Sequence, residues 1–215
     1  TASNSETVDL GGNIRFADDG PAIDVVKGVE TGVVLTTQDA QTIGLASDTD
    51  VSAANFGGVF SIGSSSYGAD GAGSTTALSY TLDVVGYGGV NGVDSTLDSD
   101  GASIYLHEIA GAIVGSTSTT TAGVTEGNTI FSIQVDGSGV VTLTQFAEID
   151  HPIAGDPSPT ATPFEDHFAV LADNLVTLTA SATITDGDGD TASNSETVDL
   201  GGNIRFADDG PAIDV

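Results

Sequence analysis

The chain has 215 residues, with 31 Asp and Glu against 3 Lys and Arg, and its formal net charge is −28. Nucleic acid and anionic membrane surfaces are excluded as partners, because a protein binds either of them through a basic patch on its own surface. Cations are the natural partners of so acidic a chain. Hydrophobic residues make up 39% of the chain, so we expect it to fold, and without cysteine it forms no disulfide and no thiolate metal site.

The chain begins with a segment that occurs twice. Thr1–Val25 recurs letter for letter as Thr191–Val215, which indicates one repeat plus an overlap, cut from a tandem array. We therefore expect residues 1–20 to be the last strand and linker of a preceding repeat, and residues 210–215 to begin the next one. Residues 21–209 would form the domain itself. No apolar run approaches the length of a membrane span, so no membrane insertion is expected.

The residues between the two copies have the pattern of short β-strands. Glycine and proline punctuate the chain, Thr and Val are abundant, and no long stretch has a helical period. Leu78–Val84 and Phe131–Val135 alternate apolar and polar side chains, and Asp136–Gly139 then reads as a hairpin turn. Leu175–Thr185 is the clearest strand, with one apolar and one hydroxylated face. We predict an all-β fold, an immunoglobulin-like antiparallel β-sandwich with extra hairpins, and not a parallel β-solenoid, which would show a short coil repeat.

Several polar clusters along the chain are candidate loops or metal sites. Asp98 and Asp100, which precede a glycine, are the secondary calcium candidates. The glycine-rich segment Gly68–Gly73 is interpreted as a solvated loop. His151 and His167 flank a proline-rich segment beside aspartates, where a transition-metal site is the alternative to a surface loop.

The sequence Asp186-Gly-Asp-Gly-Asp190 places three carboxylates at alternate positions, and its glycines let the backbone curl so that the oxygens converge. Ca²⁺ takes several oxygen ligands at about 2.3–2.6 Å, which short Asp side chains in a tight loop supply. The spacing opens like an EF-hand loop, but Thr191 and Thr197 stand where an EF-hand requires glycine and glutamate. A polar hairpin turn is the alternative. We favour calcium at Asp186, Asp188 and Asp190, because three carboxylates in an empty turn repel each other.

A short Asp-Asp-Gly-Pro linker lies near the end of each copy of the duplicated segment, and we expect so short a linker to allow little movement between domains. If the last two strands form a hairpin, the Asp186–Asp190 turn lies at one pole of the domain, and the outgoing linker leaves from the other pole. The incoming linker then reaches the pole with the turn, so calcium at each junction would lock adjacent domains into a rod. The predicted junction ligands, including an aspartate beyond each proline, are Asp18, Asp19, Asp24, Asp208, Asp209 and Asp214.

Motifs spread over most of the chain follow one another in a characteristic order: Tyr67–Ser74, Gly92–Ser95, Ile104–Leu106, Val140–Gln145, Ile149–Pro152, Leu175–Leu178, Thr185–Thr191 and Phe206–Pro211. This order resembles the large repeats of RTX-type adhesins and toxins, which Gram-negative bacteria export by type I secretion. The resemblance covers roughly residues 56–211. It implies a calcium-stabilised, immunoglobulin-like extender module, with calcium ligation by Asp186, Asp188, Asp190 and the linker aspartates.

We expect the chain to be such a structural extender, in which calcium stiffens a tandem rod that holds a distal ligand-binding region away from the cell. Its partners would be the identical neighbouring repeats and calcium ions, its location the cell surface, and the isolated chain would be a monomer. The alternative is a lectin-like, calcium-dependent carbohydrate-binding module, in which loop calcium bridges to sugar hydroxyls. No enzymatic activity is expected, because no carboxylate pair or histidine constellation stands out from the other acidic residues.

Overall fold

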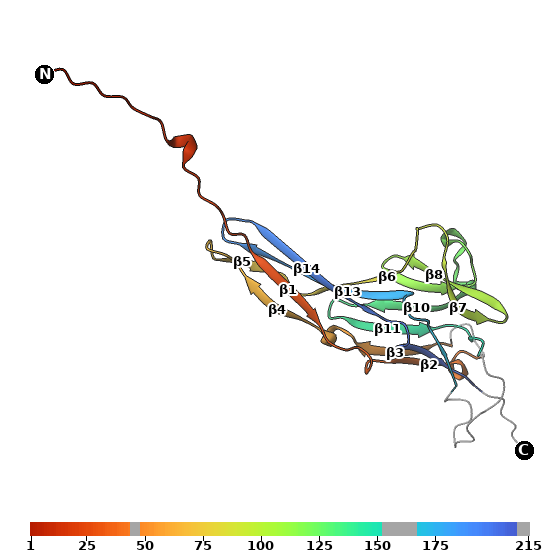
Figure 1. The fold of residues 1–215 in the computed structure, drawn as a ribbon. Coiled ribbons are helices and arrows are strands. Elements are labelled where there is room, and N and C mark those ends of the chain that lie inside the picture. Colours follow the sequence, from red (N-terminus) through yellow and green to blue (C-terminus); the bar gives the residue numbers. More distant parts are fainter. Residues whose placement is uncertain (44–47, 152–166, 210–215) are drawn as a thin grey trace, which may run out of the picture.

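The computed structural model describes residues 1–43, 48–151 and 167–209. Over these residues the chain forms fifteen β-strands and five short 3₁₀-helices (Figure 1). The strands are β1 (Ala22–Lys27), β2 (Leu35–Gln38), β3 (Asp50–Asn55), β4 (Phe60–Ser66), β5 (Ala72–Thr75), β6 (Ser79–Val84), β7 (Val93–Ser99), β8 (Ala102–Ile109), β9 (Ala112–Ser116), β10 (Thr129–Val135), β11 (Val140–Gln145), β12 (Phe168–Val170), β13 (Val176–Asp186), β14 (Thr191–Asp199) and β15 (Ile204–Ala207). The 3₁₀-helices are η1 (Gly11–Asn13), η2 (Asp39–Gln41), η3 (Gly57–Val59), η4 (Thr121–Gly123) and η5 (Glu126–Asn128). None of the helices in this part of the chain has the length and apolar content needed to cross a bilayer.

Several antiparallel sheets make up the fold. One layer is a six-stranded sheet in the order β3-β11-β10-β9-β8-β7. Facing it are a sheet built on β13, which pairs with β14 on one side and with β5 and β6 on the other, and a three-stranded sheet in the order β12-β15-β2. The pairing of β2 with β15 is parallel. The prediction of an all-β fold is therefore confirmed.

The hydrophobic core lies between these layers. It combines buried side chains of the six-stranded sheet, such as Ile104, Phe131 and Leu143, with Leu178 of β13 and Phe206 of β15. The rings of Phe131 and Phe206 meet across the layers with their centroids 5.1 Å apart. Burial of these apolar faces against each other drives the two layers together, and the result is a sandwich-like arrangement.

The longest strand, β13, extends beyond this core toward one end of the domain, where a smaller group of strands packs together. At that end a two-stranded sheet of β1 and β4 packs against β14. The Val25 amide of β1 donates to Asn194 Oδ1 at 2.9 Å, and Lys27 Nζ lies 3.4 Å from Glu196 Oε2. These contacts hold β1 in place directly after the residues that enter the domain from the N-terminal side.

The two ends of the domain differ in what they receive from the chain. Residues 1–20 are exposed and extend away from the domain, and they arrive at the end where the Asp186–Asp190 turn connects β13 to β14 (Figure 1). Residues 208–209 leave β15 at the opposite end. We call the end with the Asp186–Asp190 turn the proximal pole and the end with residues 208–209 the distal pole. The domain limits at residues 20 and 209 stay a prediction.

Candidate metal centre

Asp186 is the last residue of β13, and the alternation of that strand turns its side chain inward. Every second residue from Val176 to Asp186 is buried, so the carboxylate faces the same side as the apolar residues before it and is 3% exposed. Its Oδ1 accepts hydrogen bonds from the amides of Gly189 at 3.1 Å and Asp190 at 2.8 Å. Its Oδ2 is buried and has no hydrogen-bond donor among the described residues. A buried carboxylate oxygen in this state is costly unless a water molecule, a cation or a proton satisfies it.

The loop that precedes β5 lies directly against this turn. The backbone of Asp70 approaches Gly187 so closely that a Cβ on Gly187 would stand 2.2 Å from the Asp70 carbonyl oxygen. Only glycine allows two backbones to meet at this distance. The pairing of Ala72 with Asp186, which starts the contact of β5 with β13, holds the loop there.

The incoming residues 18–19 complete the proximal pole. Asp19 Oδ1 accepts a hydrogen bond from the Ala69 amide at 2.8 Å, and a Cβ on Gly68 would lie 2.0 Å from the Asp19 carbonyl oxygen. Gly68 has a φ of 71°, a conformation that side chains other than glycine rarely adopt. The linker is thus seated on the turn before β5, beside the carboxylate of Asp70.

These three segments bring five aspartates into two overlapping sets. Asp186, Asp188 and Asp190 each offer a carboxylate oxygen within 4.8 Å of the others, and Asp18, Asp70 and Asp188 do the same. Asp188 belongs to both sets, so the turn and the linker share one acidic site. A hard divalent cation with several oxygen ligands matches this donor set.

The pKa values at the proximal pole reflect carboxylates that face one another. A shared hydrogen bond with Asp186 raises the pKa of Asp188, and a shared hydrogen bond with Asp18 raises that of Asp190. Desolvation, followed by the neighbouring Asp18, raises the pKa of Asp70. Burial opposes the ionised form of Asp186, but its hydrogen bonds with Asp188 and the turn amides outweigh burial, so its pKa lies below the ordinary value. Adjacent carboxylates of this kind repel one another when they are ionised, and a bound cation would relieve that repulsion.

The structure gathers part of the predicted ligand set and adds one residue to it. Asp18, Asp186, Asp188 and Asp190 meet as the hairpin argument predicted. The added residue, Asp70, lies in the segment Gly68–Gly73, for which the sequence predicted a solvated loop. Its glycines, which flank a single aspartate, were the sequence feature that could have indicated a close backbone contact at this position.

Two other predicted junction ligands, Asp19 and Asp24, belong to neither of these sets. Asp24 lies within β1, opposite Ser64 of β4, and belongs to neither set. Asp214 lies outside the described residues.

The predicted ligands Asp208 and Asp209 lie at the distal pole. Asp208 Oδ1 is 3.6 Å from His151 Nδ1, and the same nitrogen is 3.5 Å from Oδ2 of the buried Asp39. Burial raises the pKa of Asp39 from 3.8 to about 7. Burial and the adjacent Asp208 raise the pKa of Asp209. Asp39 was not predicted, and its position depends on a contact between segments that are far apart in the sequence.

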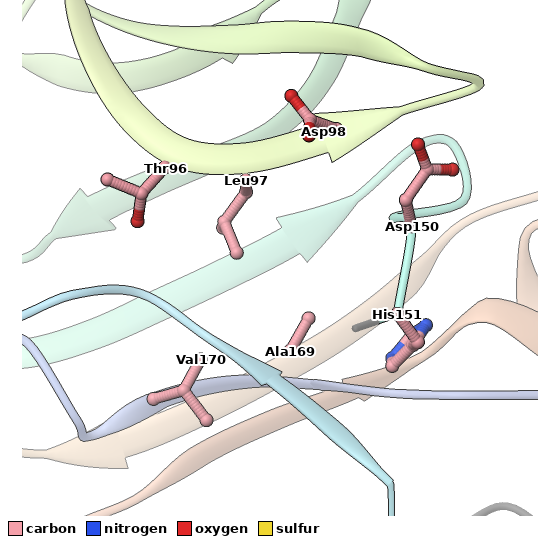
Figure 2. A pocket seen from close by; sticks show the side chains of 7 residues that line it. All are labelled: Thr96, Leu97, Asp98, Asp150, His151, Ala169 and Val170. Carbon is pink, nitrogen blue, oxygen red and sulfur yellow. The ribbon is translucent and has the colours of Figure 1, made fainter. Parts of the chain in front are cut away.

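Asp98 is the penultimate residue of β7, and Asp100 lies in the turn between β7 and β8, near the distal pole. The Asp150 carboxylate accepts hydrogen bonds from the amides of Asp100 at 3.1 Å and Gly101 at 2.8 Å, and the Asp150 amide donates to the Asp98 carbonyl at 2.8 Å. Figure 2 shows Asp98, Asp150 and His151 around a cleft of about 280 Å³. Among the described residues Asp98 and Asp100 belong to no cluster of three metal ligands, so calcium at this turn stays a prediction.

One comparison with known proteins finds a match. The family model described as "Domain of unknown function (DUF5801)" matches residues 34–201, which is well over half of the chain. No curated protein and no solved structure matches the chain.

Proposed function

The chain belongs to the DUF5801 family of domains of unknown function, and from that premise we propose that it is a calcium-stabilised structural module of a tandem array. In this proposal calcium at the proximal pole fixes each linker to the next domain and makes the array a stiff rod. The motifs that resemble the repeats of RTX-type adhesins support a place in a type I-secreted surface adhesin of Gram-negative bacteria, where the rod would hold a ligand-binding region away from the cell.

One observation carries the proposal: the linker contributes its carboxylate to the site of the domain it enters. Asp18 lies within 4.8 Å of Asp70 and Asp188, counted between the nearest carboxylate oxygens. Because Thr1–Val25 is identical to Thr191–Val215, Asp18 occupies the same position of the repeat as Asp208. A residue that leaves the distal pole of one domain is therefore also a ligand at the proximal pole of the next, and a connection of this length permits little independent motion.

The chemistry of the proximal pole supports calcium in particular. Its donors are carboxylate oxygens from a tight turn, an adjacent loop and the linker, which is the type of ligand that Ca²⁺ prefers. Extracellular modules bind Ca²⁺ with dissociation constants of about 10⁻⁴–10⁻³ M, so 10 mM calcium stabilises the folded state by roughly 1.4–2.7 kcal/mol for each independent site. The ion also neutralises carboxylates that would otherwise repel one another across the junction.

Small-angle X-ray scattering of a protein with two consecutive repeats tests the proposal. With calcium we expect the maximum dimension of a straight rod, and with chelator a smaller dimension and a broader distance distribution, because the linker is released. Asp188→Asn in the second repeat should reproduce the chelator effect in part. Asp83→Asn, which removes an exposed charge from β6, should behave like the unchanged protein. A maximum dimension that is the same with and without calcium contradicts the rigid-linker mechanism.

A further inference from the structure

The cluster at the distal pole differs from the proximal site because it contains imidazole and is largely buried. His151 Nδ1 lies 3.5 Å from Asp39 Oδ2 and 3.6 Å from Asp208 Oδ1, and one donor atom of each residue lies within 4.8 Å of the other two. The side chains of His151 and Asp39 are 5% and 3% exposed, and that of Asp208 is 20% exposed. Three segments that are distant in the sequence therefore point one donor each into the same small volume.

The orientation of His151 is set by its other ring nitrogen. Nε2 lies 3.0 Å from the carbonyl oxygen of Phe206, and because a carbonyl only accepts hydrogen bonds, Nε2 carries a proton. Nδ1 of the neutral ring then presents a lone pair to two carboxylate oxygens. This arrangement is repulsive unless a proton, on Nδ1 or on a carboxyl such as that of the buried Asp39, or a metal ion lies between them.

The distances favour a metal ion over a proton. A charge-assisted N–H···O bond measures about 2.7–2.9 Å, which is shorter than both separations at His151 Nδ1. Two ligand atoms bound to one Zn²⁺ at about 2.0–2.2 Å stand roughly 3.3–3.6 Å apart when the angle between them is tetrahedral. The separations from Nδ1 to the two carboxylates agree with this geometry.

A second layer of contacts orients the ligands. Asp39 Oδ1 accepts hydrogen bonds from Gln145 Nε2 and from the Ile149 amide, which directs Oδ2 toward His151. On the other side of the cluster His167 Nδ1 lies 4.0 Å from Asp208 Oδ2 and brings a second imidazole to the same carboxylate. Metal-binding histidines and carboxylates are commonly held in this way by carbonyl and amide groups behind them.

We propose that Asp39, His151 and Asp208 form a binding site for a divalent transition metal ion of the Zn²⁺ type, separate from the calcium site proposed for the proximal pole. Imidazole nitrogen combined with carboxylate oxygen suits Zn²⁺, whereas Ca²⁺ takes six to eight oxygen ligands. Because Asp208 belongs to the linker, an ion here fixes the direction in which the chain leaves the domain.

Thermal unfolding of the full chain in calcium-saturated buffer, with and without ZnCl₂, tests this site. We expect Zn²⁺ to raise the Tm of the unchanged protein and to have little effect on His151→Gln and Asp208→Asn. His107→Gln is the matched control, since His107 is also buried but binds Ser118 O and Thr121 Oγ1, so its Zn²⁺ response should persist. No Zn²⁺ response in the unchanged protein, or an equal response in His151→Gln, overturns the proposal.

A spectroscopic titration gives a readout that does not depend on the folding of variants. Co²⁺ added to the unchanged protein should produce the visible absorption of a low-symmetry nitrogen and oxygen site, and Zn²⁺ should displace it while excess Ca²⁺ should not. A spectrum that stays that of aqueous Co²⁺, or one that Ca²⁺ abolishes, contradicts the assignment. These titrations follow His151 and Asp39, which belong to neither set at the proximal pole, so their failure can be told apart from a failure of the scattering experiment when a calcium-selective chelator is used there.

Discussion

The same described sequence, residues 1–19 and residues 191–209, has two conformations in one molecule. In the first copy Val8, Leu10, Ile14 and Phe16 are 80%, 56%, 59% and 94% exposed, and the 3₁₀ turn Gly11–Asn13 is its one regular element. In the second copy the equivalent residues Val198, Leu200, Ile204 and Phe206 are 3%, 0%, 0% and 0% exposed, and the segment forms β14 and β15.

The difference lies in the partners, since the residues are identical. β14 pairs with β13 from Thr191 to Asp199, and β15 lies between β12 and β2. The first copy has no such strand beside it in the described structure. This sequence therefore forms strands only in the copy where neighbouring strands bury one of its faces. This is expected, because the tendency to form a strand depends on packing against neighbouring strands.

The largest expected effect comes from one substitution made in each copy. Phe206→Ala removes a fully buried ring that contacts Phe131, and we expect it to lower the free energy of unfolding by about 3–5 kcal/mol. Phe16→Ala removes the same ring from an exposed position and should change it by less than about 0.5 kcal/mol. Urea denaturation of both variants measures the difference. A similar loss in both would mean that the first copy packs against a domain in solution.

An effect of intermediate size is expected from the same substitution made in each copy of the linker, because only the first copy contributes a carboxylate to the proximal site. Asp18→Asn should weaken calcium binding at the proximal pole by about tenfold or more, because the number of charged ligands sets the affinity of such sites. The stabilisation by 10 mM calcium, followed as the rise in Tm, should then lose a large part of the roughly 1.4–2.7 kcal/mol expected from one site. Asp208→Asn, at the same position of the repeat, should keep the calcium response. An identical response in both variants, or a melting curve that chelator leaves unchanged, contradicts calcium binding by the linker.

Much of the fold and four of the five aspartates of the proximal site could be predicted from local patterns. The alternation that ends at Ile184 places Asp186 on the inward face, so the strand pattern and the position of the first ligand come from one stretch of sequence. The hairpin then determines which pole receives the linker, and this was sufficient to bring Asp18 to Asp188 and Asp190.

The remaining site residues depend on contacts that no local pattern contains. Asp70 reaches the site because β5 pairs with the end of β13, and the register of two strands so far apart is set by the whole sheet. Asp39 meets Asp208 because β2 runs parallel to β15, an arrangement that the alternation of neither strand specifies, and His151 is held beside them through the Phe206 carbonyl. Both long-range pairings are decided by core packing between layers.

The smallest predicted effect concerns the turn between β10 and β11. Unlike the duplicated segment, this turn is held by contacts among residues close together in the sequence. Asp136 Oδ1 accepts hydrogen bonds from Ser138 Oγ, the Ser138 amide and the Val140 amide, and these hold the pKa of Asp136 below its ordinary value of 3.8. A pKa lowered by folding stabilises the protein above pH 3.8, and this contribution disappears as pH falls through the pKa of the folded state. Asp136→Asn should therefore lower the urea midpoint at pH 7 by an amount that shrinks as the pH falls below 3.8 and the unchanged carboxyl takes up a proton. Asp83→Asn, in the middle of exposed strand surface, should show no such convergence. If Asp136→Asn lowers the urea midpoint by the same amount at pH 7 and at a pH well below 3.8, the ionised carboxylate does not stabilise the turn. Local contacts would then fail to predict the stability of this turn, just as local strand propensity fails to predict the conformation of residues 1–19.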